Sequence, residues 1–188
     1  MPHPIAPTPP SPAQPLRRRH LMLGALALAC SPQIRAQVGP EGGTTQPTDA
    51  RPHLQGQTVD GQRLALSDLQ GQVVLVFHWS TECAVCRDKM HELRANVAGW
   101  ARQPFRLLGV NWDPSRQDLV NYEALLRQTV PPLQRLQSIW TGDDHYQSSM
   151  DRPAHLPMTY LIDKRGQLID QYSGRIPPQA WDRIASLL

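Results

Sequence analysis

Cysteine is scarce in this chain of 188 residues, which contains only Cys30, Cys83 and Cys86. Three cysteines cannot build the dense disulfide framework that holds many small secreted domains together. A hydrophobic core must therefore stabilise the fold, and roughly 135 residues beyond a non-globular N-terminal part are enough for one such domain. Cys30 lies in a segment that we expect to be removed or modified, which leaves Cys83 and Cys86 as an isolated pair.

The chain also lacks a strong net charge. Its formal net charge is +3 at neutral pH, and the basic run Arg17 to Arg19 contributes to that value from outside the predicted domain. Binding to nucleic-acid phosphates requires a concentrated basic face, which such a charge balance does not indicate. We therefore expect no nucleic-acid partner.

The apolar run Leu21 to Ala29 is too short to cross a bilayer as a helix, which takes about 20 residues. It follows the basic residues Arg17 to Arg19, and this order is typical of an export signal peptide. Signal peptidase requires small side chains before the cut, so we expect cleavage after Ala36, with Ala29 as the alternative. The sequence thus predicts an exported, periplasmic protein.

Several residues in this region bear on the export route and on anchoring. Arg18 and Arg19 resemble the pair of a twin-arginine signal, although Arg17 stands where Ser or Thr is usual. Cys30 is a candidate for lipidation, but Ala27 stands where a lipobox has Leu. Membrane association through an uncleaved or lipidated N-terminus therefore remains an alternative to a freely periplasmic protein.

Proline marks the start of the folded domain, because many of the 19 prolines precede residue 53. Residues 1–36 form the Pro-rich leader and export signal in this prediction. Residues 37–52, rich in Gly, Pro and Thr, are expected to form a flexible linker. The folded domain is expected to span residues 53–188.

Hydrophobic periodicity predicts strands and helices in this domain. Asp60 and Gly61 indicate a hairpin turn between short strands at 54–58 and 63–66, because Gly accepts the positive φ of a tight turn. The apolar run from Val73 to Trp79 predicts a buried strand. Further strands are expected at 105–110, 138–140, 158–162 and 168–172, and helices at 84–100, 119–126 and 178–188. The predicted fold is α/β, with helices covering both faces of a mixed sheet.

Cys83 and Cys86 stand one helical turn apart, where the buried strand leads into a helix. The first thiol should lie beside the unpaired N–H groups of the helix start, which favours its thiolate. We expect Cys83 to attack a partner disulfide and Cys86, one turn further in, to resolve the mixed disulfide. Half of a zinc site and an inert disulfide are the alternatives, but no second spaced pair of ligands accompanies the cysteines.

Three stretches together resemble the exported TlpA/ResA/DsbE branch of thioredoxin-like thiol-disulfide oxidoreductases, within the redoxin/AhpC-TSA-like superfamily. They are residues 71–79, Cys83 to Arg87, and Leu156 to Asp163, and residues 59–69 are similar to that branch's N-terminal hairpin. The resemblance covers residues 53–188. It implies a thioredoxin-like fold with an extra N-terminal β-hairpin.

The same resemblance implies the parts of the site. Pro157 matches a proline that in the family is cis and faces the cysteine pair, and the backbone of Leu156 would contact the substrate. The redox-active disulfide Cys83/Cys86 would be sufficient, without a metal or another cofactor. The implied partners are protein disulfide substrates and a membrane thiol electron donor of the DsbD/CcdA type. Substrates in the branch include cysteines awaiting haem or copper, which points to cytochrome c biogenesis.

The residues around the cysteines depart from the family pattern. Glu82 stands where Trp is usual, and its carboxylate should raise the pKa of Cys83, whereas Arg87 opposes that effect. Lys89 and His91 replace a common Glu and Pro.

The buried acid that assists proton transfer in thioredoxins is also missing, because Phe77 occupies its position. The sequence therefore identifies no single residue that transfers the proton of Cys86. The candidates are Glu82, His78 and His91.

The dipeptide between the cysteines bears on the direction of electron transfer. Strong oxidants often carry a His there, and Ala84 and Val85 offer none, which favours a disulfide reductase. Three other functions are alternatives to a reductase. They are a peroxiredoxin-like peroxidase, a Sco-like copper carrier using His145 or His155, and a non-catalytic interaction domain.

Overall fold

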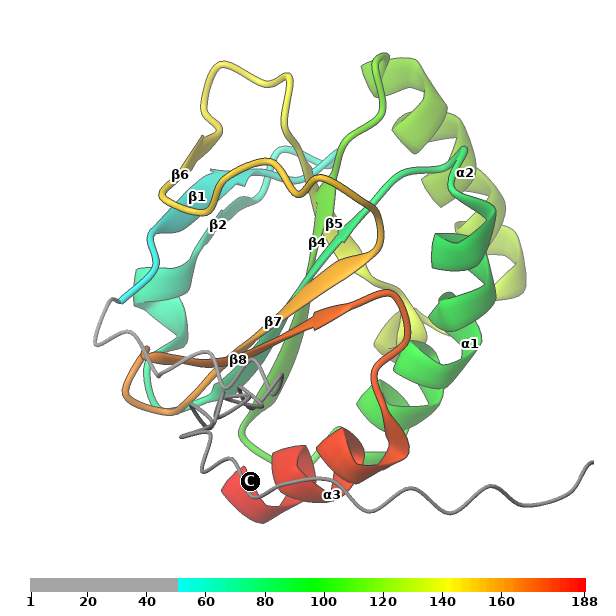
Figure 1. The fold of residues 1–188 in the computed structure, drawn as a ribbon. Coiled ribbons are helices and arrows are strands. Elements are labelled where there is room, and N and C mark those ends of the chain that lie inside the picture. The colour runs from blue at the N-terminus through cyan, green and yellow to red at the C-terminus, as the bar shows by residue number, and fades with distance from the viewer. Residues whose placement is uncertain (1–50) are drawn as a thin grey trace, which may run out of the picture. The chain divides into compact units, whose positions relative to one another are not determined.

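A computed structural model describes residues 51–188 of the chain (Figure 1). The predicted leader and export signal, Cys30 and nearly all of the predicted linker lie outside the described residues. The larger sheet has the strand order β5-β4-β3-β7-β8, and a smaller sheet has the order β2-β1-β6. The strands are β1 (Leu54–Gln57), β2 (Arg63–Ala65), β3 (Val73–Trp79), β4 (Phe105–Asn111), β5 (Gln137–Trp140), β6 (Gln147–Ser148), β7 (Met158–Ile162) and β8 (Leu168–Ser173).

Three α-helices and two short 3-10 helices complete this part of the chain. They are α1 (Ala84–Gly99), α2 (Arg116–Thr129), α3 (Pro178–Leu187), η1 (Leu66–Leu69) and η2 (Pro132–Gln134). The predicted elements are thus confirmed, with ends that differ by a few residues. Within residues 51–188, no helix combines the length and the apolar character needed to cross a membrane.

Strand β3 lies at the centre of the larger sheet, and all seven of its residues are buried. A strand covered on both faces does not alternate apolar with polar residues, which explains its mostly apolar sequence. It pairs in parallel with β4, with Val73 opposite Phe105, and antiparallel with β7, with Val74 opposite Ile162. The mixed sheet expected from the sequence is confirmed.

Alternate residues of β3 face two separate clusters of buried side chains. Leu75, Phe77 and Trp79 belong to the cluster that contains Cys86. Val74 belongs to the other cluster, together with side chains of the N-terminal hairpin. Position along β3 therefore decides which side chains can lie near the cysteines.

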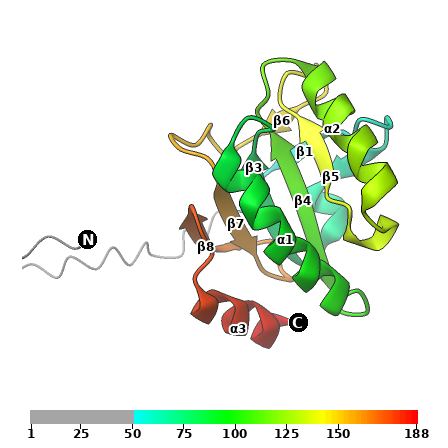
Figure 2. The same ribbon diagram turned by 90° about the vertical axis from the view of Figure 1, so that its right-hand side faces the viewer.

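The helices α1, α2 and α3 cover the same face of the larger sheet (Figure 2). Met90 of α1, Leu119 of α2 and Ile184 of α3 are buried in one cluster. The expectation that helices cover both faces is therefore wrong. The connections β3-α1-β4 and β4-α2-β5 step across the sheet in the same direction, and right-handed crossovers of this kind place their helices on one side.

The N-terminal hairpin covers the opposite face, where its Leu54 is buried in the second cluster. Strands β1 and β2 pair antiparallel, and Gly61 in their turn has a φ of 77°, the left-handed conformation that the turn was predicted to need. Strand β6 extends this small sheet by pairing with β1. Strand β6 was not predicted, because two residues carry no periodicity.

Candidate active site

Cys83 and Cys86 form a disulfide at the start of α1, with 2.09 Å between the sulfurs and 5.2 Å between the Cα atoms. Cys83 is the N-cap residue of α1, and the backbone N–H of Cys86 donates to its Sγ, with an N–S distance of 3.1 Å. A sulfur in this position lies at the positive end of the helix dipole. Local electrostatics therefore favour a thiolate at Cys83 once the disulfide is reduced.

The two sulfur-bearing residues differ in their access to solvent. Cys86 is completely buried, whereas Cys83 is partly exposed. Val85, between them, exposes 52% of its surface. Solvent therefore reaches Cys83 but not Cys86.

Hydrogen bonds hold the loop that joins β3 to Cys83. The Ser80 hydroxyl accepts from the backbone N–H of Cys83, with an N–O distance of 3.2 Å. The guanidinium of Arg87 donates to the carbonyl of Thr81, and the N–H of Thr81 donates to the carboxylate of Asp113 at 2.7 Å. The segment that presents Cys83 is thus bonded on several sides.

Asp113 is a site residue that the sequence analysis missed. Its side chain is buried with 3% exposure, and its Oδ2 accepts from the Asn111 side-chain amide at 3.0 Å. Its own N–H donates to Asn111 Oδ1, and its carbonyl accepts from the indole of Trp140 at 2.7 Å. A signal was present, because polar residues after β4 meet the loop after β3 where parallel strands end at the same edge of the sheet.

Leu156 and Pro157 lie at this same edge. Their peptide bond is cis, as the resemblance implies. The next residue, Met158, pairs with His78 near the end of β3 from which the chain leads to Cys83. Pro157 is buried, and Leu156 is partly buried against the cluster that contains Cys86.

The two residues predicted to modulate Cys83 are both exposed. No ion pair joins Glu82 to Arg87 among the described residues, and the Arg87 guanidinium binds the Thr81 carbonyl instead. Arg87 therefore contributes to the shape of the loop as well as to its charge.

His78 lies on the other face of the sheet from Cys86. It is completely buried, its Nδ1 accepts from the indole of Trp112 at 3.1 Å, and its ring packs edge-on against Tyr160. Burial lowers the pKa of His78 to about 4. A neutral imidazole separated from Cys86 by the sheet is not a proton donor for it, so the candidate His78 is discarded.

The surroundings of Phe77 differ from an acid site. A small cavity of about 10 Å³ beside Phe77 is lined by Lys89 and Glu92 of α1. The Lys89 side chain is only 13% exposed and pairs with Asp88 at 2.8 Å, while Glu92 accepts from the Trp181 indole at 2.6 Å. Ionisable groups thus reach this position from the helix rather than from β3. His91, the remaining histidine candidate, is exposed on α1.

Within residues 51–188, no group of three or more His, Cys, Asp or Glu side chains is placed to hold a metal ion. His145, one candidate copper ligand, is exposed and lies 2.8 Å from Asp143, measured from Nδ1 to Oδ1. His155, the other, is exposed as well.

Known proteins resemble this chain in sequence and in fold. The chain is 28% identical over 123 residues to "Probable thiol:disulfide interchange protein DsbE-2" of Pasteurella multocida, a match that covers 65% of this chain and 60% of that protein. The chain therefore spans less than two thirds of the length of this relative.

Solved structures share the fold. A thioredoxin family thiol:disulfide interchange protein of Chlorobium tepidum superposes with a TM-score of 0.58 at 21% identity, covering 75% of this chain and 95% of that one. A DsbF homologue from Corynebacterium diphtheriae gives a TM-score of 0.59 at 16% identity, covering 80% and 96%. The predicted thioredoxin-like fold is thereby confirmed. The sequence matches the AhpC/TSA family over residues 47–183, and the chain belongs to that family.

Proposed function

We propose that this protein is an exported thiol-disulfide oxidoreductase that reduces disulfides of partner proteins. One observation carries the proposal: a partly exposed Cys83 is paired with a completely buried Cys86 on the first turn of α1. Thiol-disulfide exchange requires one accessible thiolate to attack and one sheltered thiol to resolve. The relative from Pasteurella multocida, named as a thiol:disulfide interchange protein, supports the same chemistry.

The reaction begins with the reduced pair. The Cys83 thiolate attacks one sulfur of the partner disulfide, which forms a mixed disulfide and releases the other partner sulfur as a thiolate. Cys86, as a thiolate, then attacks Cys83 Sγ and releases the second partner sulfur. The partner gains two electrons, and the Cys83–Cys86 disulfide is formed. The Cys86 N–H directed at Cys83 Sγ stabilises the attacking thiolate.

Restoring the reduced pair takes two electrons from another dithiol. We assign this step to a membrane thiol donor of the DsbD/CcdA type, in keeping with the export signal predicted between Arg17 and Ala36. The compartment would be the periplasm, with the N-terminus as a means of membrane association. Cytochrome c biogenesis would supply substrates whose cysteines must be reduced before they receive haem.

Substrate contact is assigned to the segment before β7. Leu156 and Pro157 lie at the sheet edge that leads to Cys83. A peptide bound there would place its disulfide against Cys83, with the backbone of Leu156 as a hydrogen-bonding partner. Ala84 and Val85, which offer no His to stabilise the reduced state, favour reduction over oxidation of the partner.

The test uses the purified full chain and reduction of insulin disulfides. The wild type should accelerate the reaction, and Cys83→Ser should abolish the acceleration. Cys86→Ser should accumulate a disulfide-linked complex with the substrate, because the resolving thiol is gone. Equal rates for the wild type and Cys83→Ser would disprove the proposal.

The same preparation distinguishes the other functions. Consumption of peroxide faster than insulin reduction would favour a peroxidase. Copper retained through a desalting column by the wild type, and lost in Cys86→Ser, would favour a copper carrier.

A further inference from the structure

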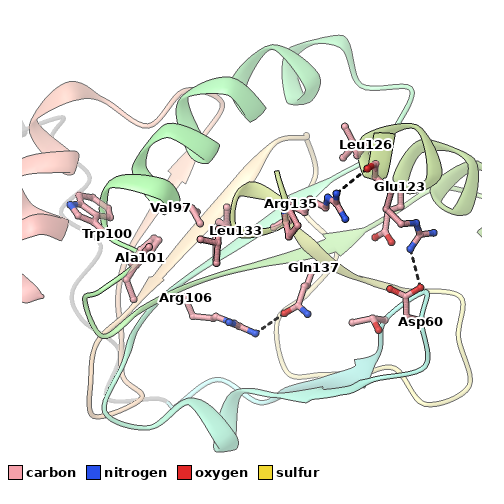
Figure 3. A pocket seen from close by; sticks show the side chains of 16 residues that line it. Asp60, Val97, Trp100, Ala101, Arg106, Glu123, Leu126, Leu133, Arg135 and Gln137 are labelled. Carbon is pink, nitrogen blue, oxygen red and sulfur yellow. Dashed lines mark hydrogen bonds and ion pairs between the residues drawn. The ribbon is translucent and has the colours of Figure 1, made fainter. Parts of the chain in front are cut away.

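A second cavity lies far from the cysteines, at the other end of the parallel strands (Figure 3). Its volume is about 370 Å³, within the range of sites for small molecules. Phe105, Arg106 and Leu107, the first residues of β4, line it together with Gln137, the first residue of β5. Cys83, by contrast, follows the final residues of β3, which runs parallel to β4.

One wall of the cavity is apolar. Val97 lies in the last turn of α1, Trp100 is the C-cap residue that follows α1, and Leu133 lies in η2 (Figure 3). Leu133 exposes 74% of its surface, an unusual value for a leucine in a folded domain. This wall suits the ring or chain of a small ligand and would bury apolar surface when the ligand binds.

The other wall carries guanidinium groups without acidic partners. Arg106 Nη2 donates to Gln137 Oε1 at 2.6 Å, and Arg135 donates to the carbonyls of Val130 and Arg127 at 2.7 and 2.9 Å. In the part of the chain described, neither Arg106 nor Arg135 forms an ion pair. Within residues 51–188, the Nη1 atoms of Arg106 and Arg135 make no hydrogen bond. Two positive groups are therefore available to an anion.

The acidic residues at the cavity do not cancel this charge. Asp60 pairs with Arg127 at 2.9 Å, so these two side chains balance each other. Burial and the nearby Asp60 carboxylate raise the pKa of Glu123 to about 7, against the opposing effect of Arg127 and Arg116. Glu123 Oε1 is buried without a hydrogen-bond partner among the described residues. The cavity lining is thus net positive, and more so below neutral pH.

We propose that this cavity binds a small organic anion, with its apolar body against Trp100 and Leu133 and its acidic group at Arg106, while Arg135 adds positive charge to the lining. A carboxylate or a sulfonate suits a guanidinium group, because the anion can accept two parallel N–H hydrogen bonds from it. The site is separate from the redox pair, so binding should be the same in the wild type and in Cys83→Ser. It extends beyond the proposed reductase activity and does not depend on it.

The test uses naphthoate and its uncharged analogue naphthylmethanol as probes of the full chain. Tryptophan fluorescence and backbone amide shifts report binding. We expect saturable binding, with naphthoate about tenfold tighter than the alcohol, as for one charge-assisted hydrogen-bonded group. Shifts should centre on Phe105 to Leu107 and on Leu133.

Variants identify the walls. Arg106→Gln should weaken naphthoate about tenfold and leave the alcohol unchanged, whereas Arg106→Lys, a control for folding and charge, should keep the preference for the anion. Leu133→Ser should weaken both probes equally. In the wild type, naphthoate binding should weaken between about pH 6 and about pH 8, as Glu123 becomes charged. Glu123→Gln should remove this pH dependence.

Three results would overturn the proposal. They are no saturable binding of naphthoate, equal affinity for acid and alcohol, and amide shifts that centre on Cys83 instead of the cavity.

Discussion

The backbone N–H of Thr81 donates to the carboxylate of Asp113, with 2.7 Å between the nitrogen and Oδ1. Thr81 lies two residues before Cys83, and Asp113 follows the neighbouring parallel strand β4. A side chain distant in sequence thereby positions the loop that presents the exposed sulfur. The bond is short and buried at the carboxylate, so its loss should be costly.

Asp113→Ala should lower the free energy of unfolding by about 1–3 kcal/mol, because the Thr81 N–H and the Asn111 amide lose their acceptor. Asp113→Asn should lower the free energy of unfolding by less than Asp113→Ala does. The Asn oxygen can still accept from the Thr81 N–H, although the Asn amide nitrogen then faces the Asn111 amide and accepts nothing from it. Urea titration of the oxidised protein measures both values. The same loss in the two variants would contradict this role.

In the reduced protein, iodoacetamide should modify Cys83 much faster than Cys86 near neutral pH. Cys83 is partly exposed at the N-cap of α1, whereas Cys86 is completely buried. Both the helix dipole and access favour reaction at Cys83. Mass spectrometry of the digested protein at successive times gives the two rates, and equal rates would refute the assignment of attacking and resolving thiols.

The buried His78 should make the fold less stable in acid. Its pKa falls from 6.5 in the unfolded chain to about 4 in the folded protein, so between these values the unfolded state binds more protons. Stability should therefore decrease as pH falls from about 6.5 to about 4, by at most about 3 kcal/mol. Melting temperatures across this window should show the decrease in the wild type.

His78→Gln is the matched variant, because a glutamine oxygen can still accept from the Trp112 indole but does not titrate. Its melting temperature should vary less with pH over the same window. An identical pH dependence in the two proteins would assign the acid sensitivity to other groups.

Glu123 should have the opposite effect. Its pKa rises from 4.5 to about 7 on folding, so the folded state binds more protons between these values and stability should fall as pH rises through them. Glu123→Gln should therefore melt at a higher temperature than the wild type at about pH 8, with the difference shrinking toward about pH 4.5. Asp118→Asn, at an exposed position in the same helix, is the control. A difference that does not change with pH would contradict the expectation.

The strand, cysteine pair and helix that form the candidate site could be predicted from sequence because they are continuous in the chain. The run from Val73 to Trp79 and the helical spacing after Cys86 each encode their own local structure. The side of β3 on which His78 lies also follows from alternation with Phe77, once the face of Cys86 is known. The pattern of apolar residues along β3 does not show on which face of the sheet Cys86 is buried.

Features that depend on packing between distant elements were either not predicted from the sequence or predicted wrongly. The placement of α2 depends on the order of β4 and β5 in the sheet, which no single helix encodes. Asp113 reaches Thr81 only because two strands end side by side. The cavity at Arg106 is assembled from two helices, two strands, η2 and the hairpin, so no local motif marks it.

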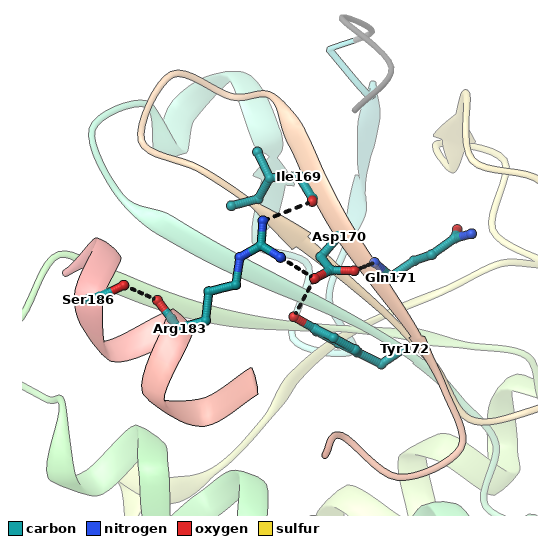
Figure 4. Close-up of polar contacts among 6 residues, drawn as sticks. All are labelled: Ile169, Asp170, Gln171, Tyr172, Arg183 and Ser186. Atoms are coloured by element: carbon teal, nitrogen blue, oxygen red, sulfur yellow. Dashed lines mark hydrogen bonds and ion pairs between the residues drawn. The ribbon is translucent and has the colours of Figure 1, made fainter. Parts of the chain in front are cut away.

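An ion pair and several hydrogen bonds join α3 to β8, at the edge of the larger sheet (Figure 4). Asp170 of β8 accepts from Arg183 of α3 at 2.7 Å and from the Tyr172 hydroxyl at 3.0 Å. Arg183 also donates to the Ile169 carbonyl at 3.5 Å. Because the Arg183 side chain is about half exposed, this group orients α3 more than it stabilises the fold.

The alternation along β3 also limits how the strand can pair. A shift by one residue against β4 and β7 would carry His78 to the face of Cys86 and place Trp79 under the hairpin. The imidazole would lose its bond from Trp112, and the indole of Trp79 would lose its bond to the Ser138 hydroxyl. The polar atoms of His78 and Trp79 thus penalise a misaligned sheet, and the register that pairs His78 with Met158 is selected during folding.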